Sequence, residues 1–123
     1  MISDAAVITK SRVLLSTMLV CTMSSAHAWE ASFTPAITSD YDFRGITLTA
    51  RKPALQFSFD VGADNGFAAG IWASNVDFGV PDVHVEVDYT LGWSGETGIV
   101  GWSAGAAYYS YPNGSELNYP EFW

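Results

Sequence analysis

The segment from Val83 to Trp93 alternates between apolar and polar residues without interruption. Side chains on a β-strand point to opposite faces with a period of two, so this pattern predicts a strand with one apolar and one polar face. The segment is also long, because a membrane-spanning β-strand needs about 9–11 residues whereas globular strands cluster near 5–6. This segment therefore restricts the possible folds more than any other feature of the chain.

The N-terminus has the order of a secretory signal peptide. Two basic residues precede the apolar stretch Val13–Met23, and Ala26-His27-Ala28 supplies a small-x-small cleavage site. The apolar stretch is too short for a membrane anchor, since a spanning helix needs about 20 residues. Cys21 follows Val20, where a lipoprotein signal would have a small residue. We therefore expect residues 1–28 to be a signal peptide that is removed on export.

After such cleavage the chain is strongly acidic. Residues 29–123 keep three of the five Lys and Arg residues and twelve of the thirteen Asp and Glu residues, which leaves a net charge of −9. Phosphate binding needs clustered Lys and Arg, so we expect no nucleic-acid partner. The single Cys lies in the signal peptide, so the exported part has no disulfide and no thiol chemistry.

Turn signals divide the rest of the chain into predicted strands. Asp64-Asn65-Gly66 is typical of a tight hairpin, because Asn-Gly accepts the positive φ of a type I′ turn. The polar stretch Arg44–Pro53 is the longest predicted loop. No connection is long enough for a crossover helix, so consecutive strands should pair antiparallel as an up-and-down meander. The predicted strands are Glu30–Phe43, Ala54–Ala63, Phe67–Phe78, Val83–Trp93, Ile99–Tyr111 and the shorter Asn118–Trp123.

The assignment of faces is clear in most of these strands and weak in one. Leu55, Phe57, Phe59 and Val61 form one face of their strand, and alternation is equally regular after Ile99. In Phe67–Phe78 the two faces differ less. There we assign Trp72, Val76 and Phe78 to the apolar face.

Two architectures share this alternation. In a soluble β-sandwich the apolar face is the core, whereas in an outer-membrane barrel it meets lipid and the polar face lines the lumen. Long strands, aromatic residues near strand ends and an almost complete lack of Lys favour the barrel. Five strands and a short sixth cannot close a barrel, and hydrocarbon does not tolerate an open sheet edge. We therefore expect residues 29–123 to be the N-terminal half of an all-β, outer-membrane β-barrel.

Three segments together resemble a known family. They are Ser39-Asp40-Tyr41-Asp42-Phe43-Arg44-Gly45, Trp72-Ala73-Ser74-Asn75-Val76-Asp77-Phe78-Gly79 and Tyr108-Tyr109-Ser110-Tyr111-Pro112. With the signal peptide before them, they are similar to the TorF-like porins of proteobacteria, also known as the Gcw_chp family of unknown function. The resemblance implies an outer-membrane β-barrel that is longer than this chain. It implies a fold and a location, and it supplies no functional residues.

The polar faces suggest a lumen more than an active site. His84, Glu86 and Asp88 alternate on one face and could hold a divalent metal, but solvated lumen charges explain them as well. Arg44 alternates with Asp40 and Asp42, either as a filter element or as an ion-pair partner of Asp40, Asp42 or Asp77. The predicted lumen residues are Asp40, Asp42, Arg44, Asp60, Asp77, His84, Glu86 and Asp88.

These observations lead to an expected function. We expect a porin-like passive channel for small solutes, in contact with outer-membrane lipid and with a mild cation preference. The sequence contains no catalytic motif, so we expect no enzyme, no cofactor and no bound metal. A barrel that conducts nothing and serves a structural or surface-interaction role, and a secreted β-sandwich that binds a ligand, stay open as alternatives. The oligomeric state is open as well.

Overall fold

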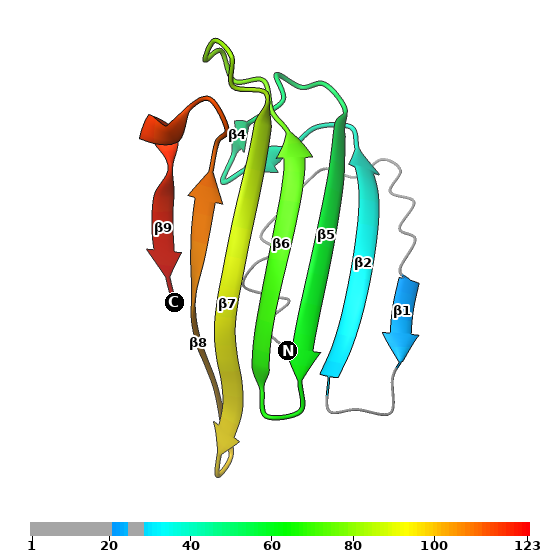
Figure 1. Cartoon of the computed structure of the whole chain (residues 1–123). Coiled ribbons are helices and arrows are strands. Elements are labelled where there is room, and N and C mark those ends of the chain that lie inside the picture. Colours follow the sequence, from blue (N-terminus) through cyan, green and yellow to red (C-terminus); the bar gives the residue numbers. More distant parts are fainter. Residues whose placement is uncertain (1–20, 25–28) are drawn as a thin grey trace.

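A computed structural model describes residues 21–24 and 29–123 of the chain. They form an antiparallel seven-stranded sheet in the order β1-β2-β5-β6-β7-β8-β9, and β3 pairs with β4 as a separate hairpin (Figure 1). The predicted all-β antiparallel meander is thus confirmed. The elements are β1 (Cys21–Ser24), β2 (Trp29–Thr38), β3 (Asp42–Phe43), β4 (Ile46–Thr47), β5 (Ala54–Ala63), β6 (Phe67–Asn75), β7 (Val85–Thr97), β8 (Val100–Ser110), the short 3-10 helix η1 (Ser115–Leu117) and β9 (Tyr119–Phe122).

The sheet is open across the described residues. Strands β1 and β9 lie at its two edges and do not pair with each other. Membership of these strands in a larger barrel therefore stays a prediction. Of the predicted signal peptide, only Cys21–Ser24 falls within the described residues, where it pairs with β2, and the rest lies outside them.

Among the residues that the structure describes, there is no helix with the length and apolar character to cross a membrane.

Cross-strand register sorts the side chains into two faces. Phe59 pairs with Ile71, which pairs with Tyr89, and all three are about half exposed. Three residues further along, Gln56 pairs with Ser74 and Ser74 with Glu86, and all three are buried. Since side chains alternate along each strand, one face of the sheet is apolar and exposed, while the other is polar and is covered around Gln56, Ser74 and Glu86.

The face assigned to Trp72 from sequence is wrong. Trp72 pairs with Ser58 on one side and Asp88 on the other, so it lies on the polar face, and Ile71 takes the apolar face of β6. Val76 and Phe78 lie beyond the end of β6 and pack with the buried cluster at that end of the sheet. The run of small residues in β6 gave no contrast between faces, and the neighbouring strands set its register.

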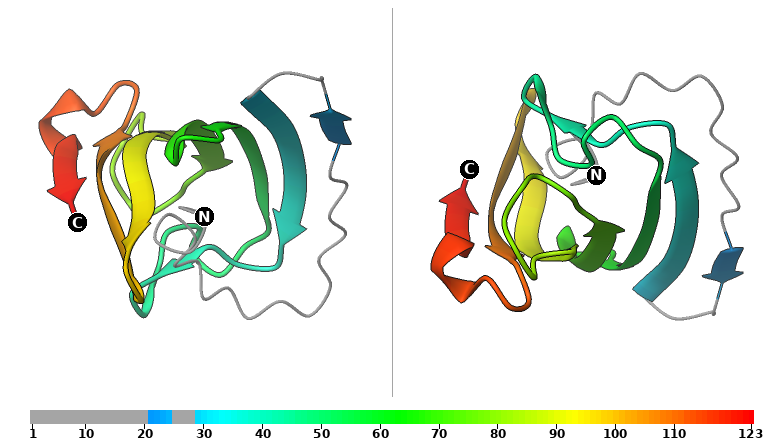
Figure 2. Two further views of the ribbon diagram at one scale, coloured as in Figure 1. Left: turned by 90° about the horizontal axis from the view of Figure 1, so that it is seen from below. Right: turned by 90° about the horizontal axis from the view of Figure 1, so that it is seen from above.

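The sheet curves (Figure 2). Its polar face is the concave one, because the β3–β4 hairpin on the concave side contacts that face: Phe43 meets Tyr109, and Arg44 pairs with Glu121. Residues 42–47 lie across the open side of this curve, opposite β6. The apolar face is therefore the convex one. We use "concave face" and "convex face" for these two sides, and "strap" for residues 39–53, which connect β2 to β5 and contain the β3–β4 hairpin.

The two ends of the sheet differ in their connections. Tight turns join β5 to β6 and β7 to β8 at one end, while the strap, residues 76–84 and residues 111–118 form longer loops at the other (Figure 1). The buried apolar cluster sits at this long-loop end and comprises Tyr41, Ala54, Val76, Val83 and Tyr111. The main packing of the described residues is therefore between loops and the concave face, not between two sheets.

Candidate functional site

Two carboxylates of β7 lie on the concave face. Glu86 is 1% exposed and Asp88 is 8% exposed, although both lie on a strand whose other face carries half-exposed apolar side chains. Glu86 faces Ser74 across the ladder, and Asp88 lies between Trp72 and Tyr109. Burying a charge is costly unless hydrogen bonds or opposite charges compensate it, so this pair marks the most polar and most covered part of the sheet.

The phenol of Tyr41 covers Glu86. Tyr41 lies in the strap, is 3% exposed, and its hydroxyl donates a hydrogen bond of 2.8 Å to Glu86 Oε1. Burial, followed by the negative charge of Glu86, raises the pKa of Tyr41 above its usual value, so the phenol stays protonated and donates. The second oxygen of Glu86 and one oxygen of Asp88 have no hydrogen-bond partner among the described residues.

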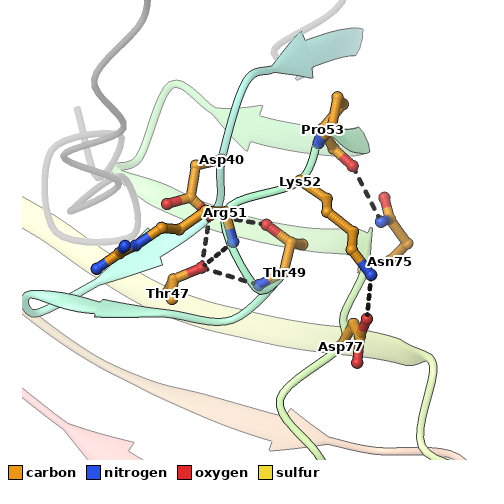
Figure 3. A network of polar contacts seen from close by, with 8 residues as sticks. All are labelled: Asp40, Thr47, Thr49, Arg51, Lys52, Pro53, Asn75 and Asp77. Atoms are coloured by element: carbon orange, nitrogen blue, oxygen red, sulfur yellow. Dashed lines mark hydrogen bonds and ion pairs between the residues drawn. The ribbon is translucent and has the colours of Figure 1, made fainter.

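Hydrogen bonds within the strap fix its shape (Figure 3). Asp40 Oδ1 accepts hydrogen bonds of 2.6 Å from the Thr47 hydroxyl and 2.9 Å from the Thr49 hydroxyl. These bonds, that from Thr47 above all, hold the pKa of Asp40 below its usual value. The Arg51 amide donates to Thr47 Oγ1 at 2.9 Å, and the Leu48 amide to the Tyr41 carbonyl at 2.6 Å. The strap is therefore an ordered element with its own polar network.

Contacts along its length join the strap to the sheet. The rings of Tyr41 and Trp72 meet edge to face with centroids 5.2 Å apart, and those of Phe43 and Tyr109 are 6.1 Å apart. Beyond them, Arg44 forms an ion pair with Glu121 of β9. These contacts reach β6, β8 and β9 in turn, so the strap crosses the concave face from one side to the other.

A second ion pair fixes the end of the strap that leads into β5. Lys52 Nζ lies 3.1 Å from Asp77 Oδ2, and the Asp77 amide donates a 2.6 Å hydrogen bond to the Leu48 carbonyl. Asn75 Nδ2 donates to the Pro53 carbonyl at 3.3 Å beside this pair (Figure 3). Asp77 therefore anchors the strap at the end of β6.

The structure brings together only part of the predicted lumen set. Glu86 and Asp88 share the concave face as expected, and Asp60 lies on the same face nearer the tight turns, exposed. His84 does not join them. It is exposed in the loop before β7, because β7 begins at Val85 and Val83 is drawn into the buried cluster. The expected column of His84, Glu86 and Asp88 is therefore reduced to its two carboxylates.

The first predicted strand ends earlier than expected. β2 stops at Thr38, so Asp40, Asp42 and Arg44 lie in the strap and do not alternate along one strand. Asp42 Oδ1 accepts a 2.8 Å hydrogen bond from the Gly45 amide, and Arg44 and Gly45 have positive φ values of 52° and 86° in the hairpin turn. The partner of Arg44 is Glu121, in place of the Asp40, Asp42 or Asp77 that alternation suggested.

The sequence reasoning missed the residues that complete the site. They are Tyr41, Gln56, Trp72, Tyr109 and Glu121. Glu121 could have been found as the charged residue of the last predicted strand, whereas Tyr41 and Trp72 carry no pattern that separates them from core aromatics. Among the described residues, no three His, Cys, Asp or Glu side chains lie close enough to hold a metal ion.

Comparison with known proteins gives one match. A family model described as a bacterial protein of unknown function (Gcw_chp) matches residues 22–122. No curated protein matches the chain. No solved structure matches it either.

Proposed function

The chain belongs to the Gcw_chp family, and from that premise we propose that it works as a porin-like passive channel, part of an outer-membrane β-barrel of the TorF-like kind. The signal peptide expected at residues 1–28 is consistent with export. Solutes would diffuse along the concave face without a cofactor or a covalent step. The antiparallel meander and the signal-like N-terminus support this proposal jointly.

The observation that carries the proposal is the reversal of the usual burial pattern. Phe59 is 50% exposed and Leu91 is 49% exposed, while the charged Glu86 is almost fully covered. Soluble proteins cover their large apolar faces, whereas a barrel wall turns its apolar face to lipid and its polar face inward. The exposed apolar residues of the convex face are Trp29, Phe33, Ile37, Leu55, Phe57, Phe59, Ile71, Val85, Tyr89, Leu91, Trp93, Val100, Trp102, Tyr108 and Phe122.

Two further features support a membrane location. Outer-membrane barrels have short turns on the periplasmic side and longer loops outside, and the sheet has this asymmetry. At the tight-turn end, Phe67 contacts Trp29 and Trp93, with ring centroids 5.8 Å and 4.6 Å apart. Clustered aromatic residues at one strand end are typical of a membrane–water interface. The strap would then lie on the outer side of the membrane.

Planar-bilayer recording tests the proposal directly. The full-length protein, extracted from membranes, should give stepwise conductance, and its reversal potential in a salt gradient should show a mild cation preference from the acidic concave face. A protein that inserts and stays silent would contradict the channel. Anion selectivity would contradict the predicted preference.

One observation favours a second candidate. The strap crosses the concave face and covers Glu86, which is also what a closed barrel with a structural or surface-interaction role would show. Small barrels are often filled by their own side chains. The same recording separates the two candidates, because the closed barrel inserts without conducting.

A further inference from the structure

We infer that the strap is the constriction of the proposed channel and that its positive charges reduce the preference of the channel for cations. The inference rests on the proposed function, because a constriction has meaning only where solutes pass. It concerns residues 39–53, of which the predicted lumen set included only Asp40, Asp42 and Arg44.

The position of the strap is the first argument for a constriction. Tyr41 reaches Glu86 on β7, Phe43 reaches Tyr109 on β8, and Arg44 reaches Glu121 on β9. These three partners all belong to the concave face, at successive positions along the strands. The strap therefore lies on the path of a solute that moves along the concave face toward the long-loop end of the sheet (Figure 2).

The distribution of charge is the argument for an effect on ion selectivity. Arg44, Arg51 and Lys52 are all the Lys and Arg residues of the segment 29–123, and every one lies in the strap. The concave face carries the carboxylates Glu86, Asp60 and Glu121. The strap also holds Asp40 and Asp42, so its net charge is 3 − 2 = +1. A net positive segment opposite a negative wall creates a field across the passage between them. The strap thus opposes the attraction that the acidic wall exerts on cations.

The strap charges are available to solutes. Arg44 and Lys52 keep 56% and 69% of their side chains exposed, although both form ion pairs. Exposed ion pairs of this kind hold their partners weakly. The Arg51 side chain has no ion-pair partner among the described residues. All three cations can therefore act on ions passing through the constriction.

The decisive experiment neutralises these charges. We would substitute Arg44→Gln, Arg51→Gln and Lys52→Gln together in the full-length protein and measure the reversal potential in a KCl gradient. The permeability ratio of K⁺ over Cl⁻ should rise at least about twofold, because the acidic wall then acts unopposed. Asp64→Asn is the control, since Asp64 is exposed in the tight turn at the opposite end of the sheet and should leave the ratio nearly unchanged.

A second variant tests the constriction itself. Tyr41→Ala combined with Phe43→Ala removes the two aromatic contacts of the strap and should raise the single-channel conductance. Tyr89→Ala is its control, because Tyr89 lies on the convex face and is about half exposed. If the double variant does not fold, the charge variant still tests the inference. Its three substituted side chains are exposed, so their replacement should not prevent folding.

The outcomes separate the inference from the function on which it rests. Conductance in the wild type with an unchanged K⁺/Cl⁻ ratio in the charge variant would overturn the inference and leave the channel intact. A silent wild type together with a conducting Tyr41→Ala, Phe43→Ala variant would support the strap as an obstruction and overturn the open channel. Silence in the wild type and in every variant would overturn both.

Discussion

At the scale of single residues, the hydrogen bond between Tyr41 and Glu86 has the largest expected effect on stability. Tyr41→Phe keeps the ring against Trp72 and leaves Glu86, 1% exposed, without its donor. An unsatisfied buried partner costs about 1–3 kcal/mol, so the free energy of unfolding in urea should fall by that amount. Tyr89→Phe, on the exposed convex face, should change it by less than about 0.5 kcal/mol. Equal effects of the two variants would mean that Glu86 does not depend on Tyr41.

Asp40 gives the fold a predicted dependence on pH. Its folded-state pKa lies below the unfolded value of 3.8, because the Thr47 and Thr49 hydroxyls bond the charged form. The resulting stabilisation is present above the unfolded pKa and is lost as the pH falls through the lower folded pKa. The stabilities of the wild type and of Asp40→Asn in urea should therefore differ at pH 7, and the difference should shrink as the pH falls below 3.8 and through the folded-state pKa. A difference that persists at the lowest pH would exclude this cause.

Residue patterns in the sequence predicted some positions well and others poorly. Glu86 and Asp88 were placed on the correct face of their strand because strict alternation on a long strand allows only one assignment. His84 was misplaced because alternation continues in sequence past the point where the strand begins. Trp72 was misplaced because Ala and Gly neighbours on both faces of β6 hide its direction, which pairing with Ser58 and Asp88 decides.

At the scale of elements, the pairing of β8 with β9 depends on glycine at position 105, which has no side chain. A Cβ added at Gly105 would lie 2.5 Å from the Trp123 ring and 2.6 Å from the Leu91 carbonyl oxygen. Gly105→Ala should therefore destabilise the sheet by about 1–3 kcal/mol, as overpacking does. Gly101→Ala on the same strand meets nothing within 4 Å and should be neutral or slightly stabilising. Urea unfolding compares the two, and an equal effect would show that β9 does not pack as described.

The strap is the element that sequence patterns could not have placed. Arg44–Pro53 was predicted as a polar loop, and nothing local indicates that such a loop turns back onto the concave face. Its position depends on contacts far apart in sequence, such as Tyr41 with Glu86 and Arg44 with Glu121. By contrast, β5 and β8 were predicted nearly to their ends, because alternation and tight turns are local signals.

At the scale of the whole molecule, the convex face should respond to charge as a lipid-facing surface does. Phe59→Lys places a charge in the middle of this face and should make folding into bilayers less favourable by about 2–4 kcal/mol. Ser58→Lys is the matched control, since Ser58 lies one residue away on the concave face beside Trp72. The yield of folded protein in lipid vesicles measures the effect of both substitutions. A larger loss from Ser58→Lys would indicate that the concave face is the covered core of a soluble protein.

Membrane fractionation tests the same assignment without substitutions. The full-length protein should remain in the outer-membrane pellet after an alkaline wash, because its exposed apolar face is held by lipid. Trp93 and Trp102, about half exposed on that face, should also be quenched by lipids with brominated acyl chains. Release by the wash together with unquenched tryptophan would favour the secreted sandwich.

The meander also has a consequence for the order of folding. Most ladders join strands that follow each other directly, so those strands can pair over short loops soon after they meet. The Arg44–Glu121 pair is different, because its two residues lie 77 positions apart. Pairing the intervening strands first shortens the effective loop that this contact closes and so lowers its entropy cost. The sheet should thus form strand by strand, and the strap should dock across it in one of the last steps of folding.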